Sequence, residues 1–319
     1  MSPMKMTARA NTNLLPRTAL VVVSVALLAL GVQFFPTPRA SGTPGTKAEP
    51  GMLVTSAWLA EHLKDKSVVI LNIGQRAAYD AGHIPGARFV EMSSISTSQP
   101  LMLELAPVEK LKTSFEALGV SDNARIIIAF SDNWISPATR VYFTLDYLGL
   151  GKQTSLLDGG VEAWRKEGRP IVTDVPQVRR GSITPHPHPE LIVDAAWVAA
   201  NLNKPKIAIV DARAPEFYSG ASAGRMPRAG HIPGAVNIPF STLGDAANKM
   251  HESTTLRKIF SEAGIKRADH VVSYCHIGQQ ATVVYFAAKY LGYDARLYDG
   301  SFEDWSRRSE LPVARPSSK

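Results

Sequence analysis

Cysteine is almost absent from this sequence, because Cys275 is the only one in 319 residues. The chain therefore has no second thiol with which to close an internal disulfide. An isolated cysteine is most often a buried thiol that packs like a small apolar side chain. The residues around Cys275 have to decide whether it is structural or reactive.

Excess charge is also scarce once the N-terminus is set aside. The formal net charge is +7, but the first 50 residues hold five basic residues and one acidic residue, which leaves +3 for the remaining 269. This charge is too small and too scattered for a nucleic-acid surface, so nucleic acid is not expected as a partner. The length and the apolar share suit two domains.

The N-terminus has the pattern of an export signal. A basic tail at 1–17 precedes an uncharged apolar run at 18–35, which at about 1.5 Å per residue would just span the ~30 Å hydrocarbon layer. We expect a signal anchor; a cleaved signal peptide is the alternative, although "TPRAS" at 37–41 is a poor cleavage site. Residues 36–51, rich in Pro, Gly, Ser and Thr, are expected to be a flexible tether.

The basic flank also predicts the compartment. Positive charge before the apolar run places the short tail in the cytoplasm and the remainder outside. The folded part is therefore expected in the periplasm or an equivalent outer compartment, held at the inner membrane by the N-terminal segment, or secreted if the signal is cleaved. Protease accessibility of intact and permeabilised cells would test this.

The rest of the chain consists of two copies of one unit. The repeated segments are AGHIPGA at 81–87 and 229–235, and DGGVEAW at 158–164 against DGSFEDW at 299–305. Prolines alternate with His186 and His188 in the stretch between the copies, and no further ligands lie nearby, so a linker is favoured over a metal site. We expect a first copy at 52–175, a linker at 176–190 and a second copy at 191–319.

Each copy alternates strands with helices. The expected strands are the β-branched runs at 68–72 and 125–130 in the first copy and at 207–212 and 270–275 in the second. The expected helices include 107–119, which opens on Pro and ends on Gly, and 253–264, which opens with Ser253 as its cap. This alternation predicts an α/β fold with a mostly parallel sheet, flanked by helices, in each copy.

Cys275 lies where a strand is expected to end and a helix to begin. In such sheets ligands bind at the carboxyl ends of the strands. Unpaired N–H groups and the positive end of the helix macrodipole favour the thiolate there. Gly278 allows the loop to turn inward so that those N–H groups converge. Aligning the copies places Ser131 opposite Cys275, with one extra residue in the first loop.

The two GHIPGA segments, DGGVEAW, DGSFEDW and a Cys-x-x-Gly-x-x-Ala loop present only in the second copy resemble the two-domain rhodaneses, the thiosulfate and 3-mercaptopyruvate sulfurtransferases. The resemblance covers about 52–315, and the N-terminal signal makes the chain similar to exported bacterial members. It implies an inactive first copy and a catalytic second copy, whose Cys275 accepts a sulfane sulfur as a persulfide.

The resemblance also implies the reaction and its partners. Cys275 would take the outer sulfur of a small donor such as thiosulfate and pass it to cyanide or a thiol, and a thiol protein is a further candidate acceptor. No cofactor is expected. With no second cysteine nearby, the persulfide would not be resolved as a disulfide.

The expected substrate-binding residues fall into two groups. The loop residues His276, Ile277, Gly278, Gln279, Gln280 and Ala281 would hold the persulfide and the donor. Arg213, Arg225 and Arg228 would add positive charge at the mouth, although for Arg213 a structural ion pair with Asp211 is favoured over anion attraction. Phe217 stands where some family members carry a substrate-binding arginine.

Three other functions are compatible with a related fold. A phosphatase of related fold needs Cys-x5-Arg, but Ala281 stands six positions after Cys275, so phosphoryl transfer is disfavoured. A non-catalytic persulfide carrier or sulfur sensor would use the same fold and thiol. A 3-mercaptopyruvate sulfurtransferase is the third, but the loop side chains His276, Gln279 and Gln280 differ from the Gly/Ser loops of those enzymes, which favours thiosulfate.

Overall fold

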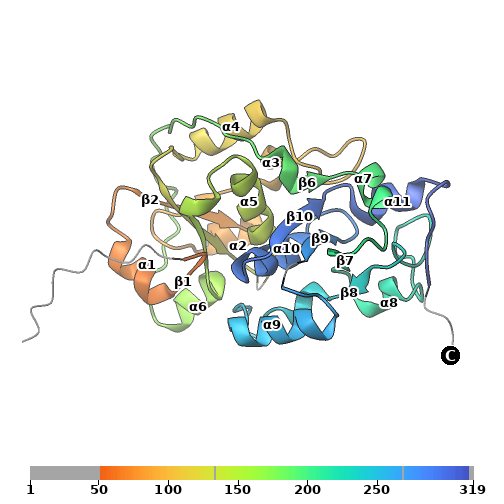
Figure 1. Ribbon diagram of the computed structural model, residues 1–319. Helices are drawn as coiled ribbons and strands as arrows, with labels where there is room; N and C mark the ends of the chain where they lie inside the picture. Colours follow the sequence, from red (N-terminus) through yellow and green to blue (C-terminus); the bar gives the residue numbers. More distant parts are fainter. Residues whose placement is uncertain (1–50, 133, 268, 316–319) are drawn as a thin grey trace, which may run out of the picture. The chain divides into compact units, whose positions relative to one another are not determined.

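The computed structural model describes residues 51–132, 134–267 and 269–315 (Figure 1). The basic tail, the predicted anchor and the tether up to residue 50 lie outside the described residues, and so does the predicted export signal. Among the described residues, no helix is both long enough and apolar enough to cross a membrane.

The first copy contains one parallel five-stranded sheet in the order β1-β5-β4-β2-β3. Its strands are Leu53–Val54 (β1), Val68–Ile73 (β2), Arg88–Phe89 (β3), Arg125–Phe130 (β4) and Thr154–Leu157 (β5). Its helices are Ser56–His62 (α1), Arg76–Ala81 (α2), Met92–Ile95 (α3), Val108–Ala117 (α4), Ile135–Tyr147 (α5), Gly160–Lys166 (α6) and the 3-10 turn Gly151–Gln153 (η1). The β-branched runs form the buried strands β2 and β4, as predicted.

The second copy repeats this topology in a sheet of order β6-β10-β9-β7-β8. Its strands are Ile192–Val193 (β6), Ile207–Asp211 (β7), Val236–Asn237 (β8), His270–Tyr274 (β9) and Asp294–Tyr298 (β10). Its helices are Ala195–Ala200 (α7), Pro215–Tyr218 (α8), Ser253–Glu262 (α9), Ala281–Tyr290 (α10), Ser301–Arg307 (α11) and the 3-10 turns Pro189–Leu191 (η2) and Phe240–Thr242 (η3). The predicted α/β class with two parallel-sheet domains is confirmed.

Both predicted helix starts differ by one position from the structure. Pro107 was expected in the first turn but is the N-cap of α4, which begins at Val108, and Gly119 follows the helix with a φ of +75°. Ser253 is the first helical residue of α9 and not its cap. The backbone at Glu252 is not yet helical, with a φ of −55° and a ψ of 147°, so Glu252 takes the N-cap position without a side-chain hydrogen bond.

The linker at 176–190 is tied to the first copy along much of its length. Its backbone has no helix or strand before Pro189. The N–H groups of Gly181 and Ile183 donate to the carbonyl and carboxylate oxygens of Glu116, and that of His188 donates to the carbonyl of Tyr147. The connection is therefore extended but held by hydrogen bonds.

Helices α5 and α10 join the two copies within one compact unit. Thr139 meets Thr282 near the start of both helices, and Phe143 packs edge-on against Tyr285, with ring centroids 4.9 Å apart, further along. Because contacting positions advance together, the helices run parallel and their N-termini lie together. A single apolar core includes side chains from both copies.

Candidate active site

Cys275 follows β9 directly and has only 1% of its surface exposed. Its N–H donates to Ser301 Oγ at 3.1 Å, and its carbonyl accepts from the N–H of Phe302 at 3.0 Å. The start of α11 thus fixes the main chain at the thiol. Burial alone would suit a structural cysteine, so the loop that follows Cys275 has to show whether the thiol is structural or reactive.

The loop at 276–280 presents main-chain N–H groups that lack partners. Among the described residues, no protein acceptor binds the N–H groups of residues 276–281. Gly278 has a φ of +82°, and a Cβ there would lie 2.7 Å from the carbonyl oxygen of Asp299, so a side chain would not fit. The predicted inward turn at Gly278 is confirmed, and α10 continues from the loop at Ala281. Such a cradle suits an anion.

His276 forms the partly exposed rim of this cradle. Its ring meets Phe217 edge-on with centroids 4.5 Å apart, and the Gln280 side chain hydrogen-bonds it. Burial, with the nearby charge of Arg213, lowers the pKa of His276 to about 4. The imidazole is therefore neutral at physiological pH. Ile277 and Gln280 are also partly exposed, whereas Ala281 is buried.

Gln279 does not face the cradle rim as predicted. Its amide donates to Ser136 Oγ at 3.3 Å, and only 7% of its surface is exposed. Ser136 lies in the first turn of α5, which the parallel packing brings beside the catalytic loop. Gln279 therefore joins the two copies, and its predicted role toward a donor does not fit this position.

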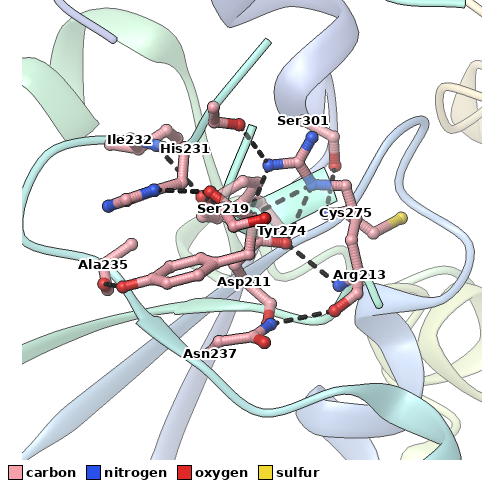
Figure 2. A network of polar contacts seen from close by, with 12 residues as sticks. Asp211, Arg213, Ser219, His231, Ile232, Ala235, Asn237, Tyr274, Cys275 and Ser301 are labelled. Atoms are coloured by element: carbon pink, nitrogen blue, oxygen red, sulfur yellow. Dashed lines mark hydrogen bonds and ion pairs between the residues drawn. The ribbon is translucent and has the colours of Figure 1, made fainter. Parts of the chain in front are cut away.

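Arg213 is buried in an ion pair, which corrects its predicted place among the substrate-binding residues. Its guanidinium donates to Asp211 Oδ2 at 2.6 Å and to the Gly230 carbonyl at 2.7 Å (Figure 2). It is 1% exposed and stacks over Phe302, with 4.1 Å from Cζ to the ring centroid. Burial opposes its charge, but the bonds to Asp211 outweigh burial and hold the pKa of Arg213 above its usual value.

The network around this pair reaches the thiol through the main chain. Tyr274 donates its hydroxyl to Asp211 at 2.7 Å, and Asn237 donates to the carbonyls of Asp211 and Arg213. The Cys275 sulfur lies at the edge of this network (Figure 2). The structural ion pair, which sequence reasoning named as the other reading of Arg213, is confirmed.

Arg225 and Arg228 have different environments. Arg228 donates to the carbonyls of Trp305, Ser306, Arg308 and Leu311 at and beyond the end of α11. These bonds occupy its guanidinium, so its predicted substrate contact is wrong. Arg225 is exposed and lines a cavity of about 440 Å³, and among the described residues no ion pair or hydrogen bond holds it. Its neighbour Gly224 approaches His276, since a Cβ on it would lie 3.8 Å from Nε2.

Sequence reasoning missed Ser301. This residue has a φ of +53°, a conformation unusual for a non-glycine residue, and is fully buried. Gly160 occupies the matching position of the first copy with a φ of +60°. The serine keeps the strained backbone and adds the hydroxyl that accepts from Cys275. The signal was present in the sequence as the change from DGG to DGS.

The first copy lacks this site. Ser131 stands in place of the thiol, and Asn72 donates to its hydroxyl at 3.3 Å. Asn72 and Gly74 replace the charged pair of the second copy. Trp134 enters the longer loop and is 46% exposed. The first copy therefore offers no thiol at this position.

The sites and sheets together define an α/β protein with two rhodanese-like domains, one of which carries a cysteine in an N–H cradle. The rhodanese-like domain family matches residues 55–167 and 194–308. The chain belongs to the rhodanese family.

Relatives share the two-copy length. The sulfur carrier protein TtuD of Thermus thermophilus is 31% identical over 284 residues, covering 84% of this chain and 98% of its own. A thiosulfate sulfurtransferase of Azotobacter vinelandii is 30% identical, covering 82% and 96%. A 3-mercaptopyruvate sulfurtransferase of Escherichia coli K12 is 29% identical, covering 82% and 96%. These names support sulfur transfer as the general activity.

Solved structures agree on the fold. EanB in complex with ergothioneine superposes with a TM-score of 0.77 at 22% identity, covering 84% of this chain and 71% of its own. The crystal structure of YnjE gives 0.73 at 22% identity, covering 84% and 69%. At this identity the likeness concerns the fold alone.

Ser301→Gly should separate stability from activity. Glycine adopts positive φ without strain, which offsets the lost hydrogen bond, so the melting temperature should change by a few degrees at most. Sulfur transfer should fall about tenfold, because the Cys275 main chain is no longer held. Ser306→Ala, which removes another buried hydroxyl of α11, is the control and should change the rate less than about twofold. Equal rates in all three proteins would contradict the role of Ser301.

His276 should make the protein acid-sensitive. Its pKa is about 4 in the folded chain and about 6.5 in the unfolded chain, so unfolding takes up a proton between these values. The stability from the neutral ring is complete above pH 6.5 and is lost as the pH falls toward 4. Urea unfolding across this range should show a shallower pH dependence for His276→Gln than for the parent. Identical slopes would show that the His276 ring is not the titrating group.

Proposed function

We propose that this chain is a thiosulfate sulfurtransferase that carries the transferred sulfur on Cys275. The observation that supports this most strongly is the thiol at the start of a loop whose N–H groups have no protein acceptor among the described residues. The N–H groups of the cradle favour binding of an anion, and a persulfide carries its negative charge on the outer sulfur. The matching loop of the first copy has no thiol.

The reaction is a double displacement. The Cys275 thiolate attacks the outer sulfur of thiosulfate, the S–S bond of the donor breaks, and sulfite leaves with the bonding electron pair. The outer sulfur of Cys275–S–S⁻ is then attacked by cyanide or a thiol, and the thiolate is restored. The loop N–H groups stabilise the charge on the outer sulfur in the intermediate.

The surroundings favour a small anionic donor. Cys275 is nearly buried, which favours a small donor over a bulky one. His276 at the rim is neutral and can donate one hydrogen bond, and Gln280 supports it. Arg225 is the one arginine of the three predicted whose guanidinium is left for an anion, because Arg213 and Arg228 are bound to protein oxygens.

A persulfide carrier is the second candidate, since a relative bears the name sulfur carrier protein. Such a protein would accept sulfur on Cys275 but would turn over slowly with a small acceptor. Multiple turnovers with cyanide favour the enzyme, and a single loading without turnover favours the carrier.

The donor comparison tests the proposal. Initial rates should be measured with thiosulfate and cyanide, and then with 3-mercaptopyruvate and cyanide, using Cys275→Ser as the blank. We expect the higher kcat/KM with thiosulfate and no transfer by the blank. Arg225→Ala should lower kcat/KM for thiosulfate by about ten- to a hundredfold if the guanidinium contacts the donor. Arg179→Ala, another exposed arginine, should change it less than about twofold.

Two results would contradict the proposal. A higher kcat/KM with 3-mercaptopyruvate would assign the other donor. Transfer retained by Cys275→Ser would remove Cys275 from the reaction altogether.

A further inference from the structure

Arg140 is a buried charge in the copy that has no nucleophile. It lies in the second turn of α5 and is 0% exposed. The repeat alignment places Val283 at the matching position of α10. A buried guanidinium is costly unless its donors are matched by acceptors. Its partners therefore show what the position contributes.

Those partners lie on the catalytic side. Arg140 Nη1 and Nη2 donate to the two carboxylate oxygens of Asp299, at 2.5 and 3.3 Å. Nη1 also lies 3.5 Å from the carbonyl oxygen of Gly278, in the catalytic loop. Nη2 donates to the Leu103 carbonyl of the first copy at 2.5 Å. The guanidinium thus bridges a loop of one copy and the catalytic loop of the other.

Asp299 connects Arg140 to the residues that surround Cys275. It follows β10, and its main chain and carboxylate border the turn at Gly278, where a Cβ would lie 2.7 Å from O and 2.8 Å from Oδ1. Two residues later, Ser301 accepts the N–H of Cys275. A shift of Asp299 would therefore move both the glycine turn and the serine that fixes the cysteine.

The repeat provides an internal comparison. Asp158 of the first copy corresponds to Asp299, and each accepts a main-chain N–H from the opposite copy: Met250 donates to Asp158 at 2.9 Å, and Leu105 donates to Asp299 at 2.8 Å. The two hydrogen bonds are equivalent. Of these two aspartates, only Asp299 is paired with an arginine among the described residues. Burial raises the pKa of Asp158. The arginine is thus an addition on the catalytic side.

We infer that Arg140 is a positioning residue, through which the copy without a nucleophile holds the catalytic loop in the shape that accepts the sulfur. The inference rests on the proposed sulfur transfer by Cys275. Arg140 acts through Asp299 and the Gly278 carbonyl and does not touch the reacting atoms. Loss of the Arg140–Asp299 ion pair loosens the N–H cradle and the serine that fixes the main chain of Cys275.

The test compares four proteins: the parent, Arg140→Lys, the charge-balanced double variant Arg140→Met with Asp299→Asn, and the matched control Asp158→Asn. Lysine keeps one charge but cannot bind both carboxylate oxygens and the two carbonyls together. The double variant removes the Arg140–Asp299 ion pair without leaving a buried charge unpaired. The control disturbs the equivalent hydrogen bond between the copies, away from the catalytic loop.

Three readouts are taken on each protein: melting temperature, kcat and KM for thiosulfate with cyanide, and the rate of Cys275 alkylation by iodoacetamide between pH 5 and 9. We expect both Arg140 variants to lose about ten- to a hundredfold in kcat per folded protein, with the pH midpoint of alkylation moved upward. Asp158→Asn should keep kcat within about twofold and the parent midpoint, even where its melting temperature falls.

These measurements distinguish a positioning role of Arg140 from a purely structural one, and both from failure of the proposed sulfur transfer. If both Arg140 variants lower the melting temperature but keep kcat and the alkylation profile, Arg140 is only structural and the inference is overturned. Equal losses of kcat in Asp158→Asn would overturn it as well, because any disturbance between the copies would then suffice. If the parent transfers no sulfur, the proposed function fails, and a shifted alkylation profile in the Arg140 variants still supports the positioning role.

Discussion

The parallel packing of α5 against α10 determines where the other parts of the site lie. Thr139 and Thr282 share a hydrogen bond near the helix starts, and two edge-on aromatic pairs fill the middle. At the far end Asp146 accepts from Tyr285 and Lys289. Because the helices are parallel, their N-termini lie together, and the positive ends of two macrodipoles face the same region. A copy that lacks a nucleophile thereby contributes to the environment of the one that has it.

Small changes within a shared framework distinguish the copies. Asp211, Arg213, Ser301 and Cys275 stand where the first copy has Asn72, Gly74, Gly160 and Ser131. The charged pair is neutral as a unit and fully buried, so it organises the strand ends without adding net charge beside the thiolate. Ser301 adds a hydroxyl to a backbone conformation that both copies share. Function thus depends on a few positions while the sheets, turns and core remain common.

The sequence predicted the parts of the site that are local or repeated. The repeat alignment and the strand-loop-helix pattern predicted the position of Cys275, the turn at Gly278 and the absence of a thiol at Ser131. The roles of Arg228 and Gln279 were mispredicted because proximity in sequence does not show which carbonyl or hydroxyl a long side chain will reach. Arg140 was not predicted at all, since its partner Asp299 is 159 positions away and meets it only through the packing of α5 on α10. Contacts of this kind depend on tertiary structure and leave no local signal.

The most direct measurement of this asymmetry uses Ser131→Cys, which places a second thiol at the matching position of the first copy. The variant is treated with thiosulfate, and peptide mass spectrometry then locates the added sulfur. We expect one sulfur on Cys275 and none at position 131, where the loop is longer and Trp134 replaces the glycine turn. Equal loading of both positions would contradict the account, because it would show that any thiol at the end of this strand accepts sulfur and that the framework of the second copy is not required.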